Sequence, residues 1–189
     1  MKARIMKAFL EEIHEKSMKF TMDDLARRLG ISKRTLYQHF SSKTEILDAI
    51  IDSTLQEFDE KTALIMQDPQ LGLVEKIKRA ITVIPKYNDF YNWQILDQMK
   101  KTHPAQWERV HAALHEWDEL RELIEQGIRE GIIANQNVPL LMKLIIDATN
   151  STLDRKFFYE NSITVTEALD SIVDILLFGF IKKDDGVKN

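Results

Sequence analysis

Cysteine is absent from the 189 residues, so the chain has no disulfide, no thiolate metal site and no cysteine nucleophile. This absence fits the cytoplasm, where we expect the protein to work. Long apolar runs are missing too: the longest one near the C-terminus, residues 175–181, has 7 residues, whereas a helix needs roughly 20 to span a bilayer. No signal-peptide core appears near the N-terminus, because Glu11, Glu12 and His14 interrupt the segment. We therefore expect no membrane partner.

Sequence motifs of catalysis are also missing. The chain has no nucleophile elbow, no phosphate-binding glycine loop, and no serine, histidine and aspartate at a spacing that would support a triad. We therefore expect no enzyme activity, no catalytic residue and no cofactor. An active site assembled from scattered residues is the alternative that a sequence leaves open.

The charged residues are distributed unevenly along the chain. The formal net charge is −4, but residues 1–50 carry 10 Lys and Arg against 7 Asp and Glu, whereas residues 51–189 carry 16 against 23. A basic head on an acidic body favours a polyanionic partner at the N-terminal end alone.

Helical periodicity fills the sequence, which has only 6 glycines and 4 prolines and no alternating strand pattern. The pattern predicts an all-α fold. Its first helix carries the stripe Ile5, Phe9 and Ile13, and its fourth begins after Ser42 and continues to the break at Pro69. Later helices are predicted at 71–84, 87–101, 105–130, 138–160 and 164–182.

Residues 21–40 have the spacing of a helix-turn-helix. Thr21 is a natural N-cap with Asp24 three residues later, the arrangement of a capping box. Gly30 ends the short helix and allows a tight turn, and Ser32 caps the next helix. Two short helices joined in this way predict a DNA-binding element.

The helix after the turn has an inner and an outer face. At about 100° per residue, Leu36 and Phe40 point inward, while Gln38 lies opposite them between Arg34 and Thr35. Forked donors and an amide suit base edges in a major groove. For any one residue a solvated surface is the alternative interpretation, but the whole constellation favours DNA. The residues at the borders of the face, which suit phosphates, are Lys33, Tyr37 and His39.

The segment "TMDDLARRLGISKRTLYQHFSSKTEIL" resembles the DNA-binding signature of the TetR family of bacterial one-component regulators. The resemblance covers about residues 5–50. It implies an all-α homodimer with an N-terminal three-helix DNA-binding domain, residues 1–48, whose helix-turn-helix binds double-stranded operator DNA. It also implies a C-terminal helical domain, residues 49–189, for effector binding and dimerisation. The matching elements are Thr21, Leu25-Ala26, Gly30-Ile31-Ser32, Thr35-Leu36-Tyr37, His39-Phe40, and Lys43 followed by an acidic residue and Leu47.

Carried over residue by residue, the resemblance implies a role for each polar position of the motif. Tyr37, His39 and Lys43 match positions that often meet phosphates, and Lys43 lies where the N-terminus of the fourth helix offers a second anion site. Positions that often approach bases are matched by Lys33, Arg34, Thr35 and Gln38. With the two caps, the expected DNA-binding residues are Thr21, Ser32, Lys33, Arg34, Thr35, Tyr37, Gln38, His39 and Lys43.

Two broad apolar helices, 138–160 and 164–182, predict a subunit interface near the C-terminus. Their apolar faces are wider than an ordinary amphipathic stripe, which suits a four-helix dimer interface. The alternative is that both helices pack inside the core of one monomer.

Residues 87–117 are rich in aromatic side chains, and this cluster predicts an apolar cavity for a small-molecule effector. Ordinary core packing is the alternative interpretation. The candidate ligand-binding residues are Trp93, Met99 and Trp107, within a cluster that also contains Tyr87, Phe90, Tyr91 and Trp117.

Three histidines, His103, His111 and His115, offer a possible metal site, since His111 and His115 have the i, i+4 spacing of helical metal ligands. Ala112 follows the first of that pair where the metalloprotease form has a glutamate. An exposed helical face is the preferred interpretation, so we assign no metal ligand.

The function that these patterns favour is a ligand-responsive DNA-binding transcriptional regulator, most simply a repressor that a small-molecule effector releases from its operator. One alternative is a metal-sensing regulator that uses His103, His111 and His115. A second is a helical enzyme or partner-binding protein in which the N-terminal motif is only a fold element.

Overall fold

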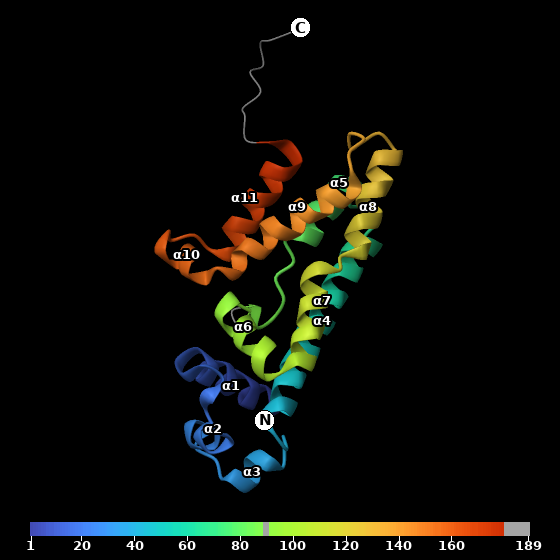
Figure 1. Cartoon of the computed structure of the whole chain (residues 1–189). Helices are drawn as coiled ribbons and strands as arrows, with labels where there is room; N and C mark the ends of the chain where they lie inside the picture. The colour runs from blue at the N-terminus through green and yellow to red at the C-terminus, as the bar shows by residue number, and fades with distance from the viewer. Residues whose placement is uncertain (89–90, 180–189) are drawn as a thin grey trace. The chain divides into compact units, whose positions relative to one another are not determined.

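The computed structural model describes residues 1–88 and 91–179, and this part of the chain is helical throughout, with no strand (Figure 1). None of its helices is long and apolar enough to cross a membrane. The elements are α1 Lys2–Lys16, η1 Ser17–Lys19, α2 Met22–Leu29, α3 Lys33–Tyr37, α4 Lys43–Gln67, α5 Leu73–Ile81, α6 Trp93–Thr102, α7 Pro104–His115, α8 Asp118–Arg129, α9 Val138–Asn150, η3 Ser151–Leu153, α10 Arg155–Glu160 and α11 Val165–Phe178.

The chain packs as two compact units. Unit 1 comprises Met1–Asp68 and Val83–Trp117, and unit 2 comprises Pro69–Thr82 and Asp118–Asn189. Unit 1 therefore holds the first four α-helices together with α6 and α7, while α5 and α8–α11 belong to unit 2. The functional division after residue 48 falls inside α4 and stays a prediction.

The core of unit 1 forms around the predicted apolar stripe of α1. Ile5, Phe9 and Ile13 are almost fully buried, and the Phe9 ring meets Phe20 edge to face at 5.1 Å between centroids. In the helices that follow, the side chains of Leu25, Leu36 and Ile46 are fully buried as well. Burial of each such side chain stabilises the fold by about 1.5–3 kcal/mol relative to exposure, so the three-helix head has a dense core.

The pattern predicts one helix over 105–130, whereas the structure has two. α7 ends at His115 and α8 begins at Asp118, with Glu116 in an extended conformation between them. The Trp117 indole donates to the Ala113 carbonyl at 3.1 Å. This bond uses one of the carbonyls that a helix leaves free at its C-terminus, which ends α7 at the boundary between the two units.

The predicted helix over 138–160 is also interrupted. Hydroxyl groups bond back to the backbone here, including Thr149 to the Ile145 carbonyl at 2.8 Å and Ser151 to the Ala148 carbonyl at 2.6 Å. Such bonds compete with the regular helical ladder. α9 therefore tightens into η3, and Asp154 caps a new helix, α10, by accepting from the Phe157 N–H at 3.2 Å.

Three other predicted helices differ mainly at their ends. α5 is shorter than predicted, and α6 begins at Trp93 because Asn92 caps it by accepting from the Ile95 N–H. α11 begins after the capping box of Thr164 and Glu167 and ends at Phe178. The remainder of the predicted range 164–182, from residue 180 on, lies outside the described residues, as does Phe90 of the aromatic cluster.

Candidate nucleic-acid interface

The first helix of the motif begins at the predicted capping box. The Thr21 hydroxyl accepts from the Asp24 N–H at 3.2 Å, and the Asp24 carboxylate accepts from the Thr21 N–H at 2.8 Å. The Thr21 hydroxyl also donates to Asp24, and these bonds to Thr21 lower the pKa of Asp24 below its usual value. Thr21 thus fixes the start of α2.

The turn after α2 requires glycine. Gly30 adopts φ 63° and ψ 34°, a left-handed conformation that glycine reaches without steric cost. The Gly30 N–H bonds the Arg27 carbonyl and the Ile31 N–H bonds the Ala26 carbonyl, each at 3.1 Å. These two hydrogen bonds satisfy backbone carbonyls at the C-terminus of α2 that have no partner within the helix. The chain then turns into α3.

Two buried anchors hold α3. Leu36 and Phe40 are almost fully buried, and Ser32 caps the helix by accepting from the Thr35 N–H at 3.0 Å. The Ser32 and Thr35 hydroxyl groups also meet at 2.8 Å. With its inner face fixed in this way, the short helix presents its opposite face to solvent.

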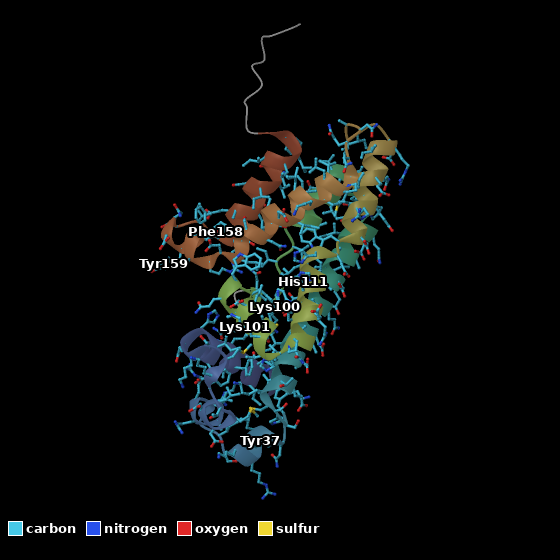
Figure 2. The ribbon with its side chains drawn as sticks, viewed as in Figure 1. Tyr37, Lys100, Lys101, His111, Phe158 and Tyr159 are labelled. Carbon is cyan, nitrogen blue, oxygen red and sulfur yellow. The ribbon has the colours of Figure 1, made fainter. Side chains whose placement is uncertain are left out.

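The predicted base-reading residues share that exposed face. Arg34 and Gln38 are exposed, and Thr35, on the other side of Gln38 from Arg34, is partly buried. Tyr37 is exposed on the border of the face (Figure 2). His39 is partly buried. The structure thus brings the expected contact residues of α3 onto one surface of unit 1.

Lys33 is less free than the sequence suggests. Its ammonium forms an ion pair with Asp23 of α2, although the Lys33 side chain remains 62% exposed. Because exposed pairs of this kind contribute about 0–1 kcal/mol, a phosphate could replace Asp23 at small cost.

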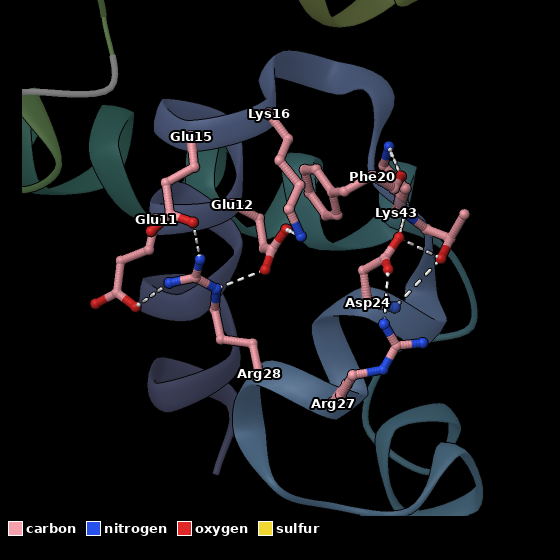
Figure 3. Close-up of polar contacts among 10 residues, drawn as sticks. Glu11, Glu12, Glu15, Lys16, Phe20, Asp24, Arg27, Arg28 and Lys43 are labelled. Atoms are coloured by element: carbon pink, nitrogen blue, oxygen red, sulfur yellow. Dashed lines mark hydrogen bonds and ion pairs between the residues drawn. The ribbon is translucent and has the colours of Figure 1, made fainter.

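Lys43, the first residue of α4, points into the protein. Its ammonium donates to the Met18 carbonyl at 2.7 Å. It also donates to the Phe20 carbonyl at 2.6 Å and lies 4.1 Å from the centroid of the Phe20 ring (Figure 3). Burial lowers the pKa of Lys43 below its usual value, against the charge of Asp24, which raises it. The expected contact of this side chain with phosphate stays a prediction.

A second polar cluster, which the sequence reasoning missed, joins α1 to α2. Arg28 of α2 binds Glu11, Glu12 and Glu15 of α1, and the Glu12 side chain is buried (Figure 3). Burial acts to raise the pKa of Glu12, but the hydrogen bonds and charges of Arg28 and Lys16 lower it below its usual value. The only signal in the sequence was a run of glutamates at helical spacing.

The three expected effector residues all lie in unit 1 but have different surroundings. Met99 is fully buried in the core, Trp93 is 48% exposed at the start of α6, and Trp107 is partly buried on α7, with the Lys100 ammonium 5.6 Å from its ring. The effector-binding role of all three stays a prediction.

Unit 2 contains an apolar cavity of about 350 Å³. It is lined by α5, α8, the segment after α8, α9 and α11, and Trp93, Met99 and Trp107 are not among its lining residues. Apart from Gln136 the lining side chains are apolar, and none is ionisable. No pattern in the sequence pointed to this cavity, because its walls come from five separate segments.

The histidines do not form a metal cluster within residues 1–88 and 91–179, where no three His, Cys, Asp or Glu side chains could hold one ion. His111 and His115 stack at 4.2 Å between ring centroids, and the His115 Nδ1 lies 2.8 Å from the His111 carbonyl. His103 instead meets the Thr102 hydroxyl at 2.8 Å.

Comparison with known proteins gives this geometry a context. Residues 5–50 match the family described as bacterial regulatory proteins, tetR family. Over 186 residues, 98% of each chain, the sequence is 30% identical to the HTH-type transcriptional regulator YvaF of Bacillus subtilis (strain 168). The chain is also 26% identical to the HTH-type transcriptional regulator SAR0097 of Staphylococcus aureus (strain MRSA252). This alignment covers 91% of the chain and 88% of SAR0097.

The fold has solved relatives as well. The TetR family transcriptional regulator PfmR from Thermus thermophilus superposes with a TM-score of 0.77 at 23% identity, covering 95% of this chain and all of PfmR. The predicted all-α fold, with an N-terminal helix-turn-helix domain followed by a helical C-terminal domain, is therefore confirmed.

Proposed function

Because the chain belongs to the TetR family of bacterial helix-turn-helix transcriptional regulators, we propose that it is a cytoplasmic, homodimeric repressor released from its operator by a small-molecule effector. The observation that carries the proposal is the outer face of α3, which is free of the core while Leu36 and Phe40 anchor its inner face. A short helix held in this way can enter a major groove without unfolding anything else.

The contact residues divide into two groups in this proposal. Arg34, Thr35 and Gln38 read base edges, because they lie at the centre of the exposed face. Tyr37 and His39 at its borders contact phosphates, which fix the register of the protein on the duplex. Lys33 can contact either a base or a phosphate once its ion pair with Asp23 breaks. The two N-cap residues, Thr21 and Ser32, lie at helix N-termini that favour phosphate.

Exposed apolar side chains on unit 2 support dimerisation. Leu140 and Leu144 of α9 and Ile175 and Phe178 of α11 are between 47% and 62% exposed. α10 adds Tyr159, 87% exposed (Figure 2). Apolar surface of this kind on neighbouring helices is typical of a protein interface. A second copy of the chain would cover it and would place two recognition helices on successive half-sites.

The cavity of unit 2 supports an effector site within this unit. Its volume of about 350 Å³ falls in the range of small-molecule pockets, roughly 300–1,000 Å³. Because no lining side chain is ionisable, the cavity favours a neutral, largely apolar effector with at most one polar group near Gln136. Effector binding would favour a state of the dimer with wrongly spaced recognition helices, and release could use no more energy than the difference in effector affinity between the two states.

The proposal is tested by selecting DNA from a randomised pool with the full-length protein, followed by titration of the selected operator and of scrambled DNA. Gln38→Ala should weaken operator binding by about 1–3 kcal/mol per half-site and leave scrambled DNA nearly unaffected. The matched control is Gln67→Ala, an exposed glutamine at the end of α4. If no symmetric site is selected, or if both variants behave alike on both DNAs, the proposal is wrong.

The metal-sensing alternative is tested with the same protein by calorimetry with zinc, and binding that is lost in His111→Ala would favour it. Absence of such binding would rule out zinc sensing through these histidines.

A further inference from the structure

The short link between α1 and α2 is held from two sides by residues far away in the sequence. Met18, in η1, donates its backbone N–H to the side-chain oxygen of Gln98 on α6 at 3.2 Å. The Met18 carbonyl accepts from the Lys43 ammonium on α4 at 2.7 Å. The link is thus the point where three helices of unit 1 meet through polar contacts, and we call Gln98, Met18 and Lys43 the Met18 latch.

The Lys43 side of the latch leaves little of the ammonium free. An ammonium has three donors, and two of them bond the carbonyls of Met18 and Phe20. The Phe20 ring lies against the charge at 4.1 Å, within the range of a cation–π contact. Lys43 therefore neutralises the carbonyl end of η1 instead of presenting its charge to solvent.

The Gln98 side of the latch belongs to a larger clamp on α4. α6 packs on α7 within unit 1, and the Gln106 side chain on α7 donates to Asp48 of α4 at 2.9 Å. Arg109, one turn further on, contacts Asp48 and also Asp52. These contacts form a closed ring that runs from α4 through η1, α6 and α7 back to α4. Met18 is the residue of this ring that lies nearest in sequence to the helix-turn-helix.

Movement of this link would move the whole DNA-reading element. Phe20 immediately precedes Thr21, the N-cap of α2, and the turn at Gly30 joins α2 rigidly to α3. A shift of residues 18–20 relative to α4 would therefore be transmitted to the exposed face of α3.

We infer that Lys43 and Gln98 are positioning residues for DNA binding: they fix the helix-turn-helix relative to α4 and α6, and thereby set the spacing of the two recognition helices in the dimer. The inference rests on the proposed DNA-binding function and extends it to Gln98, a residue outside the helix-turn-helix. It also gives Lys43 a role that needs no phosphate.

The test uses operators in which the two half-sites are separated by the selected spacer or by one base pair more or fewer. Lys43→Met and Gln98→Met remove the polar contacts and keep much of the side-chain volume. Each should reduce the preference for the correct spacer by about threefold to tenfold. The double variant should lose little more than the stronger single variant, because both changes break the same latch.

Two controls separate positioning from lost charge and from general damage. Gln94→Met and Lys101→Met change exposed residues of α6, the helix that carries Gln98. Both control variants should leave the spacer preference unchanged. On scrambled DNA, Lys43→Met should keep the salt dependence of the wild type. A decrease of roughly 0.9 in the salt slope for each lost contact would instead identify Lys43 as a phosphate ligand and overturn the inference.

Hydrogen exchange provides a readout that does not depend on DNA. The Met18 amide should exchange faster in Gln98→Met than in Gln94→Met, since its acceptor is removed. Unchanged exchange, or an unchanged spacer profile in both latch variants, would overturn the latch while leaving the proposed function intact. A wild-type protein that selects no DNA would overturn the proposed function and the latch's role in it together.

Discussion

Glu12 illustrates how one buried side chain supports the DNA-binding head. Its side chain is 2% exposed, and its carboxylate lies 2.5 Å from the Arg28 Nε and 2.9 Å from the Lys16 ammonium. A buried charge is tolerated only when it is paired and hydrogen-bonded, and here the partner on α2 ties that helix to α1. The orientation of the motif thus depends on a buried residue outside the exposed face of α3.

Glu12→Gln should destabilise the protein by about 1–3 kcal/mol at pH 7, because Arg28 and Lys16 lose the charge that they surround. The pKa of Glu12 in the folded protein lies below 4.5, its ordinary value. The stabilisation is therefore fully present above about pH 4.5 and is lost as the pH falls through the folded pKa. Urea unfolding at pH 7 and at pH 4 measures both effects, and the difference between variant and wild type should shrink at the lower pH.

Glu11→Gln is the matched control, since Glu11 lies on the same helix and contacts the same arginine. Its side chain is 46% exposed and 3.4 Å from Arg28, so its loss should change the unfolding free energy by less than about 1 kcal/mol. Equal effects of the two substitutions would show that burial of Glu12 does not matter.

At the scale of the helices, local capping signals could be read from the sequence, and long-range interruptions could not. Thr21 with Asp24, Gly30 and Ser32 mark their boundaries within three residues, and the structure has each cap as predicted. The break between α7 and α8 instead follows from the Trp117 indole reaching the Ala113 carbonyl. That contact depends on how the side chain packs, which apolar periodicity does not encode.

The same distinction applies to the candidate site. The outer face of α3 follows from helical geometry alone, so Arg34 and Gln38 could be placed without a structure. The inward direction of Lys43 could not, because the Met18 and Phe20 carbonyls that it binds lie 25 and 23 residues away. The unit 2 cavity was hidden for the same reason.

Gly127 connects α8 to the wall of this cavity. A Cβ atom at this position would lie 2.6 Å from the Ile133 Cδ1 and 2.9 Å from the Leu73 Cδ2. Alanine has a higher helix propensity by about 1 kcal/mol, but overpacking typically costs about 1–3 kcal/mol. Gly127→Ala should therefore lower the thermal midpoint, with a net loss of about 1 kcal/mol, in a calorimetric scan.

The same substitution in an Ile133→Ala background tests the cause, because alanine removes the Ile133 Cδ1 and Cγ1 atoms, which Cβ would meet at 2.6 and 2.8 Å. The penalty should shrink or change sign there. An identical penalty in both backgrounds would mean that the contact with Ile133 does not decide the cost.

At the scale of the whole molecule, the proposed DNA-binding and dimerisation surfaces belong to different units. The helix-turn-helix lies in unit 1, and the exposed apolar side chains of α9–α11 lie in unit 2. A change confined to the unit 2 face should therefore leave the contacts of one head with one half-site intact and remove only the gain from binding two half-sites at once.

Ile175→Asp provides this change, since Ile175 is 49% exposed on α11 and is not among the residues that line the cavity. Phe180, a further apolar residue of the predicted interface, lies outside the described residues. In sedimentation, the variant should be monomeric at concentrations where the wild type is dimeric, because an aspartate in the apolar face would have to be buried without a partner. Its operator affinity should fall by about 10²–10⁴, the usual gain from linking two binding events, while its binding to scrambled DNA changes little. Leu64→Asp, at a 72% exposed apolar position on α4, should remain dimeric and bind normally. A dimeric Ile175→Asp protein with full helicity would place the subunit interface on another surface.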